Sequence, residues 1–106
     1  MFDVLLAPSA VASFRALPAR VRATVRDAIE RHLRDKPTRT SKSRIKRLRG
    51  LSHPQYRLRV DDIRVFYDVT KETVEILAIV SKAEAQGWLD DKGTPDEADR
   101  TGQGEG

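Results

Sequence analysis

The chain has 106 residues, of which 39% are hydrophobic and 34% charged, and its formal net charge is +4. This length suits one domain with a modest core, and the absence of cysteine excludes disulfides and cysteine-ligated metals. The longest apolar runs are far shorter than the roughly 20 residues of a membrane-spanning helix. Residues 1–6 also lack the charged and apolar regions of a signal peptide, so we expect a cytoplasmic protein without membrane contact.

The charge is unevenly distributed along the chain. Residues 91–106 carry five acidic and two basic side chains, a net charge of −3, so with +4 in total the first 90 residues carry +7. Positions 39–49 contain no acid and six basic residues, namely Arg39, Lys42, Arg44, Lys46, Arg47 and Arg49. Such a field attracts polyanions, and the alternative is a solvated basic loop.

The chain begins with a predicted strand followed by two predicted helices. Residues 2–7 are an apolar strand, and Ser9 is a good cap for a first helix whose apolar residues recur up to Leu17. Pro18 suits the first position of a second helix, which Lys36-Pro37 ends. Its apolar stripe repeats every four residues: Val21, Val25, Ile29 and Leu33. The two helices predict a helical hairpin with one buried side.

Two strands, residues 55–60 and 63–69, follow a basic loop and are separated only by Asp61-Asp62, which predicts a β-hairpin. If Val60 pairs with Ile63, one face of the hairpin is apolar throughout. Because side chains alternate along a strand, the other face carries Arg57, Arg59 and Arg64. Like charges opposite one another destabilise a sheet, so this cluster indicates a surface that binds phosphate.

A turn at residues 70–73 leads to a last strand over residues 74–80. Pairing Thr70 with Thr73 places Val74, Ile76, Ala78 and Val80 on the apolar face and Leu77 and Ile79 beside the arginines. We expect a short helix over residues 83–90, or a partner protein, to cover this second face. The predicted fold is α+β, in the order β-α-α-β-β-β-(α), with the helical hairpin on a mainly antiparallel four-stranded sheet. Residues 1–90 form this domain, and residues 91–106 are expected to be a disordered acidic, Gly-rich tail.

The sequence has no Gly-rich phosphate loop, and neither of its two histidines lies in a metal-binding pattern. We expect His32 to pack in a helix, His53 to lie in an exposed loop, and the protein to need no metal or cofactor. RNA can supply its own nucleophile, the ribose 2′-hydroxyl. Arginines on strands can stabilise the anionic transition state, a lysine such as Lys82 can move a proton, and a ring of Trp88, Phe66 or Tyr67 can stack on a base. The alternative for Trp88 is packing of the last helix.

Three segments resemble the RelE/ParE toxin superfamily: Lys46-Arg-Leu-Arg-Gly50, Tyr56-Arg-Leu-Arg-Val60 and Asp62-Ile-Arg-Val-Phe-Tyr67. The resemblance covers roughly residues 2–90 and is nearer RelE than ParE. It implies a toxin of a type II toxin–antitoxin system, a ribosome-dependent, metal-independent mRNA endonuclease that inhibits translation. The implied partners are a cognate antitoxin and the ribosome with its mRNA, with oligomers formed only as a toxin–antitoxin complex.

The resemblance also implies roles for individual residues. The catalytic candidates are Arg57, Arg59, Arg64, Lys82 and Glu84. The RNA-binding candidates are Lys42, Arg44, Lys46, Arg47, Arg49 and Trp88. The chain departs from the pattern of active nucleases at Gln55, where a lysine is common, at Ala83, where an arginine is common, and at Trp88-Leu89, near the place of a terminal tyrosine. These departures leave three alternatives: Lys82 and Glu84 act in altered roles, the enzyme is weak, or the protein does not cut RNA.

Two other functions remain open on the sequence. The missing terminal arginine and tyrosine favour a ParE-like inhibitor of DNA gyrase, which acts by protein–protein contact. A catalytically degenerate, RNA-binding member of the fold is the third possibility. In each case an antitoxin is expected to cover the same surface, formed by Arg57, Arg59, Arg64, Leu77 and Ile79.

Overall fold

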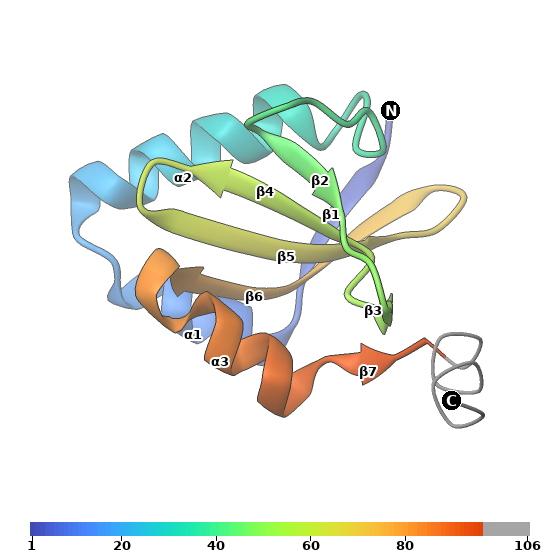
Figure 1. Ribbon diagram of the computed structural model, residues 1–106. Coiled ribbons are helices and arrows are strands. Elements are labelled where there is room, and N and C mark those ends of the chain that lie inside the picture. The colour runs from blue at the N-terminus through green and yellow to red at the C-terminus, as the bar shows by residue number, and fades with distance from the viewer. Residues whose placement is uncertain (97–106) are drawn as a thin grey trace.

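The computed structural model describes residues 1–96, which form a curved five-stranded sheet with helices on both sides (Figure 1). The elements in chain order are β1 (Asp3–Leu6), α1 (Pro8–Ala16), α2 (Ala19–His32), β2 (Ile45–Arg47), β3 (Leu51–His53), β4 (Tyr56–Val60), β5 (Ile63–Val69), β6 (Thr73–Ser81), α3 (Lys82–Lys92) and β7 (Thr94–Pro95). The sheet order is β1-β6-β5-β4-β2, with only the β1–β6 pair parallel. The predicted α+β class is confirmed, with β2 as a fifth strand beyond the four expected.

The C-terminal segment departs from the expected tail. Helix α3 continues to Lys92, and β7 pairs with β3 in a separate two-stranded sheet. The amide of Asp96 then donates to the carbonyl of Gly50 at 2.9 Å. The expectation of disorder from residue 91 is therefore wrong for residues 91–96, because these residues find backbone partners in the β3 segment. The rest of the expected tail, residues 97–106, lies outside the described residues.

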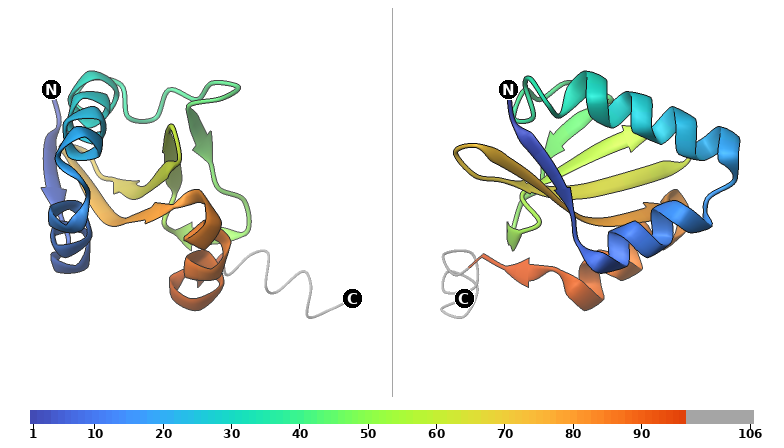
Figure 2. Two further views of the ribbon diagram at one scale, coloured as in Figure 1. Left: turned by 90° about the vertical axis from the view of Figure 1, so that its left-hand side faces the viewer. Right: turned by 180° about the vertical axis from the view of Figure 1, so that it is seen from behind.

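Helices α1 and α2 lie on one side of the sheet and α3 on the other (Figure 2). Helix α1 begins at Pro8, where proline's missing N–H is harmless, and Ala7 holds the cap position expected for Ser9. The Ser9 hydroxyl instead donates to the carbonyl of Leu77 at 3.3 Å. The apolar stripe of α2 faces the sheet, with Val25 and Leu33 at most 1% exposed.

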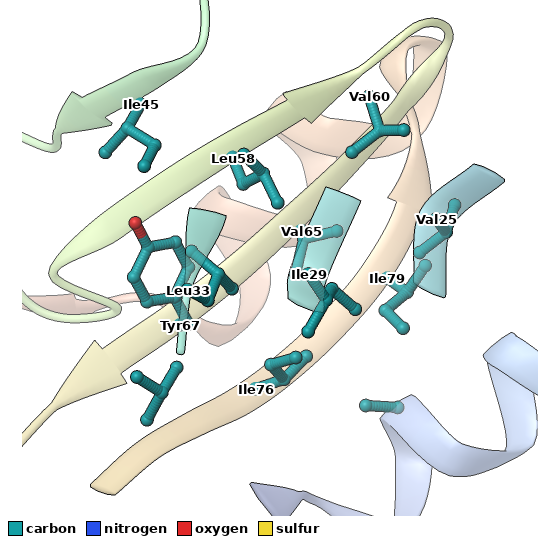
Figure 3. Close-up of a cluster of buried hydrophobic side chains, with 12 residues drawn as sticks. Val25, Ile29, Leu33, Ile45, Leu58, Val60, Val65, Tyr67, Ile76 and Ile79 are labelled. Atoms are coloured by element: carbon teal, nitrogen blue, oxygen red, sulfur yellow. The ribbon is translucent and has the colours of Figure 1, made fainter. Parts of the chain in front are cut away.

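The core lies between this helical pair and the sheet (Figure 3). Its buried members are Ala10, Val25, Ile29, Leu33, Ile45, Leu58, Val60, Val65, Tyr67, Val74, Ile76 and Ile79. The Tyr67 hydroxyl donates to the carbonyl of Pro37 at 2.6 Å, which ties the centre of the sheet to the segment after α2. Burial and the neighbouring Tyr56 raise the pKa of Tyr67 well above its ordinary value.

The register of the β4–β5 hairpin is the predicted one. Val60 is opposite Ile63, and Arg59 is opposite Arg64. The rings of Tyr56 and Tyr67 stack with centroids 5.6 Å apart on the helix-covered face. This confirms that the three strand arginines leave the sheet on the face away from α1 and α2.

The register of the last strand differs from the prediction. In β6, Ile76 is opposite Tyr67 but Ala78 is opposite Phe66, so Leu77 is an extra residue in a β-bulge. The bulge turns Ile79 into the core, where it is 3% exposed. The expected exposure of Ile79 beside the arginines is therefore wrong, because a one-residue shift exchanges the two faces. Ala78 and Val80 occupy that face instead, opposite Phe66 and Arg64.

Candidate nucleic-acid interface

The face of the sheet opposite α1 and α2 collects cations from three neighbouring strands. β4 contributes Arg57 and Arg59, and β5 contributes Arg64 directly opposite Arg59. β2 adds Lys46, which is opposite Arg57 and so shares its face. We call these four residues, Lys46, Arg57, Arg59 and Arg64, the arginine face.

Arg57 is the residue whose surroundings are least favourable to its charge. Partial burial, followed by the charges of Arg64 and Arg59, lowers the pKa of Arg57 below its ordinary value. Its Nε atom is buried and has no hydrogen-bond partner. Within residues 1–96 no carboxylate forms an ion pair with any residue of the arginine face. A bound anion would supply the missing counter-charge.

Arg64 is more deeply placed than its expected surface role implied. It is only 7% exposed, and its Nη1 atom donates to the carbonyls of Asp61 at 2.8 Å and Ile63 at 3.1 Å. The residue therefore closes the β4–β5 turn, in which Asp61 has a left-handed backbone with φ of 51°. Arg64 gives the face a fixed positive charge, but the expectation that it lies outside the packed structure is wrong.

Helix α3 borders the arginine face on the side of β6. The Trp88 ring stacks on Phe66 with centroids 5.2 Å apart and an angle of 11° between the planes. This is the packing alternative considered for Trp88, and contact of its remaining surface with RNA stays a prediction. The other two rings proposed for stacking are both buried: Phe66 is 1% exposed beneath Trp88, and Tyr67 is fully buried on the opposite side of the sheet.

The two remaining catalytic candidates lie at the start of α3. Lys82 is exposed, and its amide donates to the carbonyl of Asp62 at 2.8 Å, which places it beside the β4–β5 turn. Ser81 caps the helix by accepting from the amide of Glu84, and the Ser81 hydroxyl donates to the Glu84 carboxylate at 3.0 Å. Glu84 therefore has a capping role, and its carboxylate remains exposed.

The basic segment does not form one patch. Lys42 and Arg44 are exposed in the loop before β2, Lys46 joins the arginine face, and Arg49 is exposed beyond the strand. Arg47 points elsewhere: its guanidinium lies over the Tyr56 ring, 5.3 Å from the centroid, and Nη1 donates to the carbonyl of Gln55 at 2.8 Å. Of the predicted antitoxin contacts, Leu77 is half-buried in the bulge and Ile79 is in the core.

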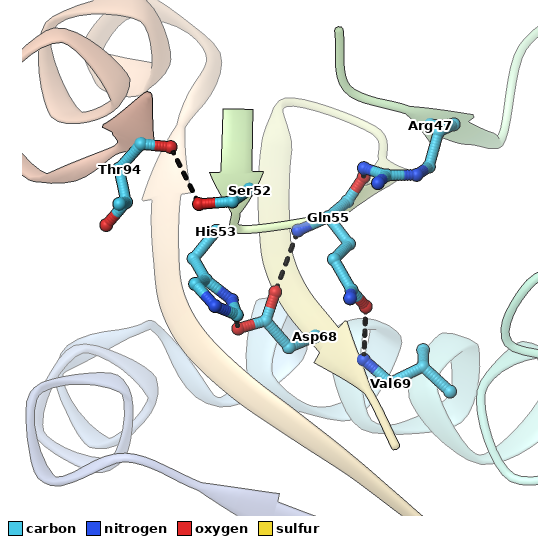
Figure 4. A network of polar contacts seen from close by, with 7 residues as sticks. All are labelled: Arg47, Ser52, His53, Gln55, Asp68, Val69 and Thr94. Atoms are coloured by element: carbon cyan, nitrogen blue, oxygen red, sulfur yellow. Dashed lines mark hydrogen bonds and ion pairs between the residues drawn. The ribbon is translucent and has the colours of Figure 1, made fainter. Parts of the chain in front are cut away.

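A polar network that sequence reasoning missed joins β3 to the end of the hairpin (Figure 4). The Asp68 carboxylate bonds His53 Nδ1 at 2.7 Å and accepts from the Gln55 amide at 2.8 Å. The Gln55 side-chain oxygen accepts from the amide of Val69 at 2.8 Å. No spacing signal indicates a bond between His53 and Asp68, which are 15 residues apart. We call these contacts the Asp68 network.

Residues 1–96 contain neither a cluster of potential metal ligands nor a helix that could span a membrane. Nowhere in this range do three or more His, Cys, Asp or Glu side chains gather closely enough to hold a metal ion. Within the same range, no helix is long and apolar enough to cross a membrane.

Similarity to known proteins covers most of the chain. The family model described as "ParE toxin of type II toxin-antitoxin system, parDE" matches residues 4–86. One chain of the RelB–RelE antitoxin–toxin complex from Methanococcus jannaschii has a TM-score of 0.63 and 21% identity, with 80% of this chain and 98% of that chain covered. One chain of the archaeal RelE–RelB complex from Pyrococcus horikoshii OT3 has a TM-score of 0.58 and 24% identity, with 76% and 94% covered. At these low identities, the structural similarity shows a common fold and nothing more. No curated protein matches the chain.

Proposed function

The chain belongs to the family of ParE toxins of type II toxin–antitoxin systems, and we propose that this toxin acts by binding and cutting messenger RNA on the ribosome. The observation that carries the proposal is the arginine face. Three guanidinium groups converge there without a carboxylate partner among residues 1–96, and one of them holds a buried, unpartnered Nε. A fold under selection for stability alone would lose this repulsion, whereas a phosphodiester relieves it.

The chemistry follows from what RNA brings to the site. The ribose 2′-oxygen attacks the adjacent phosphorus and loses its proton, the bond from phosphorus to the 5′-oxygen breaks, and that oxygen takes up a proton. The transition state carries more negative charge on its phosphoryl oxygens than the substrate does. In this proposal Arg57 and Arg59 stabilise this charge, and one such contact is worth about 3 kcal/mol, or roughly a hundredfold in rate.

Proton transfer is assigned to the start of α3. Lys82 and Glu84 are both exposed there, next to the turn that Arg64 closes. An ammonium group can give a proton to the leaving 5′-oxygen, and a carboxylate can accept one from the 2′-hydroxyl. Glu84 keeps its carboxylate at the helix start through Ser81, which gives the group a defined position.

We also propose that a cognate antitoxin inhibits the toxin by covering the arginine face. Two solved structures with this fold are complexes of a toxin with its antitoxin. An acidic segment of the partner would neutralise Arg57 and Arg59 and would block RNA at the same time. Half-buried Leu77 lies on β6 and is the remaining apolar candidate contact.

Inhibition of DNA gyrase is the second candidate, and the match to the ParE family model favours it. The helix after β6 also lacks the arginine and tyrosine of active nucleases. Exposed Ala83 stands in place of the arginine, and Trp88, near the place of the tyrosine, has its ring stacked on Phe66. In this alternative the arginine face would serve the antitoxin alone.

Primer extension on mRNA translated in the presence of the full chain separates the two candidates. The proposal predicts cuts within codons that require ribosomes and that disappear in Arg57→Met. Intact mRNA together with accumulating gyrase-dependent DNA breaks would refute it in favour of the second candidate.

A further inference from the structure

A pair of adjoining hollows lies at the C-terminal half of α2, away from the residues assigned to catalysis. The first has a volume of about 290 Å³ and lies between α2 and the loop before β2. The second, of about 330 Å³, lies between α2 and β4, and both are lined by Arg31, His32 and Arg44. Sites for drug-sized molecules occupy roughly 300–1,000 Å³, so these hollows suit a group as small as a phosphate with its sugar.

The first hollow is strongly positive. Four cations line it, Arg31, Lys36, Arg39 and Arg44, against the single carboxylate of Asp35. In the described part of the chain none of these five side chains forms an ion pair. We call the surface formed by these four cations together with His32 the phosphate hollow; its residues are Arg31, His32, Lys36, Arg39 and Arg44.

The local backbone holds Arg44 in place. The Ser41 hydroxyl oxygen accepts from the amides of Arg44 at 3.0 Å and Ile45 at 3.3 Å, and Ile45 is anchored in the core at 4% exposure. The loop that carries Arg44 is therefore fixed at its end next to the hollow. This reduces the ordering cost of binding a ligand there.

The pKa of His32 is affected by its burial and by the positive charge of the hollow. Burial lowers its pKa first, followed by the charges of Arg44 and Arg31. The other charged groups around the second hollow are Arg59, Asp27 and Asp61, whereas Asp35 is the one carboxylate in the lining of the first hollow. At neutral pH the imidazole is thus uncharged, and an anion in the hollow would favour its protonation.

The hollow adjoins the arginine face. The amide of Arg59 donates to the carbonyl of Arg44 at 2.8 Å, and Arg59 also lines the second hollow. A nucleic-acid strand on the arginine face can therefore pass over the edge of the sheet at β2 and reach Arg44.

We propose that the phosphate hollow binds a backbone phosphate of the same RNA strand, at a site separate from the phosphate on the arginine face, with Arg31, His32 and Arg44 as its ligands. This inference rests on the proposed RNA-directed function for the identity of the ligand. It adds a second anchor to that function, one that fixes the direction in which the strand leaves the cleavage site.

The proposal predicts how the affinity of the hollow for an anion changes with pH. Because an anion raises the pKa of His32, binding takes up a proton, and affinity rises as the pH falls through the range in which His32 titrates. The effect must vanish in His32→Gln. Sulfate is the probe of choice, since its charge is constant over this range while that of inorganic phosphate is not.

Sulfate titration of the full chain, followed by NMR of the histidine rings, tests the site itself. The chain has only two histidines, so His53 is an internal control. We expect sulfate to raise the pKa of His32 alone, and Arg44→Gln to weaken sulfate binding about tenfold. The matched control is Arg20→Gln, which removes an exposed arginine of α2 outside the hollow. An unshifted His32, or equal losses in both variants, would overturn the proposal.

The salt dependence of binding to single-stranded RNA tests the ligand. Arg44→Gln is expected to reduce the slope of log K against log salt by about 0.7, the value for one phosphate contact, and Arg20→Gln to leave it unchanged. If sulfate binds but the slope is the same in both variants, the hollow serves a free anion and the RNA assignment is wrong. If the wild-type chain binds sulfate in the hollow but does not cut mRNA, the result counts against the proposed function alone.

Discussion

The guanidinium of Arg64 donates to the carbonyl of Asp61, 2.8 Å away across the β4–β5 turn. Asp61 is the one non-glycine residue with a positive φ among those the structure describes. Burial lowers the pKa of Arg57 on the neighbouring strand, and the charge of Arg64 lowers it further. Arg64 thus stabilises the hairpin that presents the arginine face and also adds to the repulsion within that face.

We predict that Arg64→Ala lowers the free energy of unfolding by about 2 kcal/mol, because two hydrogen bonds from a charged donor and the packing of its stem are lost. Urea unfolding measures the change. Arg59→Ala is the control, since Arg59 is exposed, and it should lie within about 0.5 kcal/mol of the wild type. Equal stabilities of the two variants would refute the structural role of Arg64.

For Arg57→Met we expect the free energy of unfolding to rise, in contrast to Arg64→Ala. Arg57→Met removes a partly buried charge with an unpartnered Nε and two like-charged neighbours, while keeping an unbranched side chain of similar length. Replacement of buried charge by a well-packed apolar group often stabilises, so we expect a gain of about 1 kcal/mol together with loss of RNA binding. A destabilised Arg57→Met would show that its charge has a partner in the folded protein.

The capping and catalytic roles of Glu84 are separable. Glu84→Gln keeps an oxygen that accepts from the Ser81 hydroxyl, so stability should change by less than about 0.5 kcal/mol. Ser81→Ala removes the cap of α3 and should cost about 1 kcal/mol. If Glu84 transfers a proton, Glu84→Gln slows mRNA cutting at unchanged stability. Wild-type cutting rates in that variant would leave Glu84 with the capping role only.

The raised pKa of Tyr67 predicts that the protein loses stability at alkaline pH. The folded protein raises the pKa of Tyr67 above its unfolded value of about 10, so the stability from this group is full below that pH and declines above it. Tyr67→Phe should cost about 1 kcal/mol at pH 7, because the Pro37 carbonyl loses its donor. Its decline above pH 10 should be shallower than that of the wild type, as followed by unfolding at several pH values. Parallel declines would contradict this assignment.

Strand pairing was predictable where the sequence alternates and unpredictable where it does not. The β4–β5 register follows from two strands in which charged and apolar residues alternate, with Phe66 as the one apolar exception on the charged face. In β6, residues 76–80 are all apolar, so both registers bury apolar side chains and only the packed structure selects the bulge at Leu77. β2 has three residues, too few for a pattern, and its place is set by pairing with β4.

The composition of the site was predictable in part for the same reason. Alternation placed Arg57, Arg59 and Arg64 on one face, but the burial of Arg64 depends on the carbonyls of a turn that no pattern describes. Gln55 stands where the resemblance to active nucleases places a lysine. Here the Gln55 side chain accepts from the amide of Val69. Within the Asp68 network, Gln55 therefore stabilises the end of β5.

The most direct test of the arginine face is the affinity of the full chain for a fluorescently labelled single-stranded RNA, measured by anisotropy over a range of salt concentrations. We predict that Arg57→Met/Arg59→Met binds at least about tenfold more weakly and that its salt slope is smaller by about 1.4, the value for two phosphate contacts. A folded double variant with the affinity and the slope of the wild type would contradict the claim that this face binds RNA phosphates.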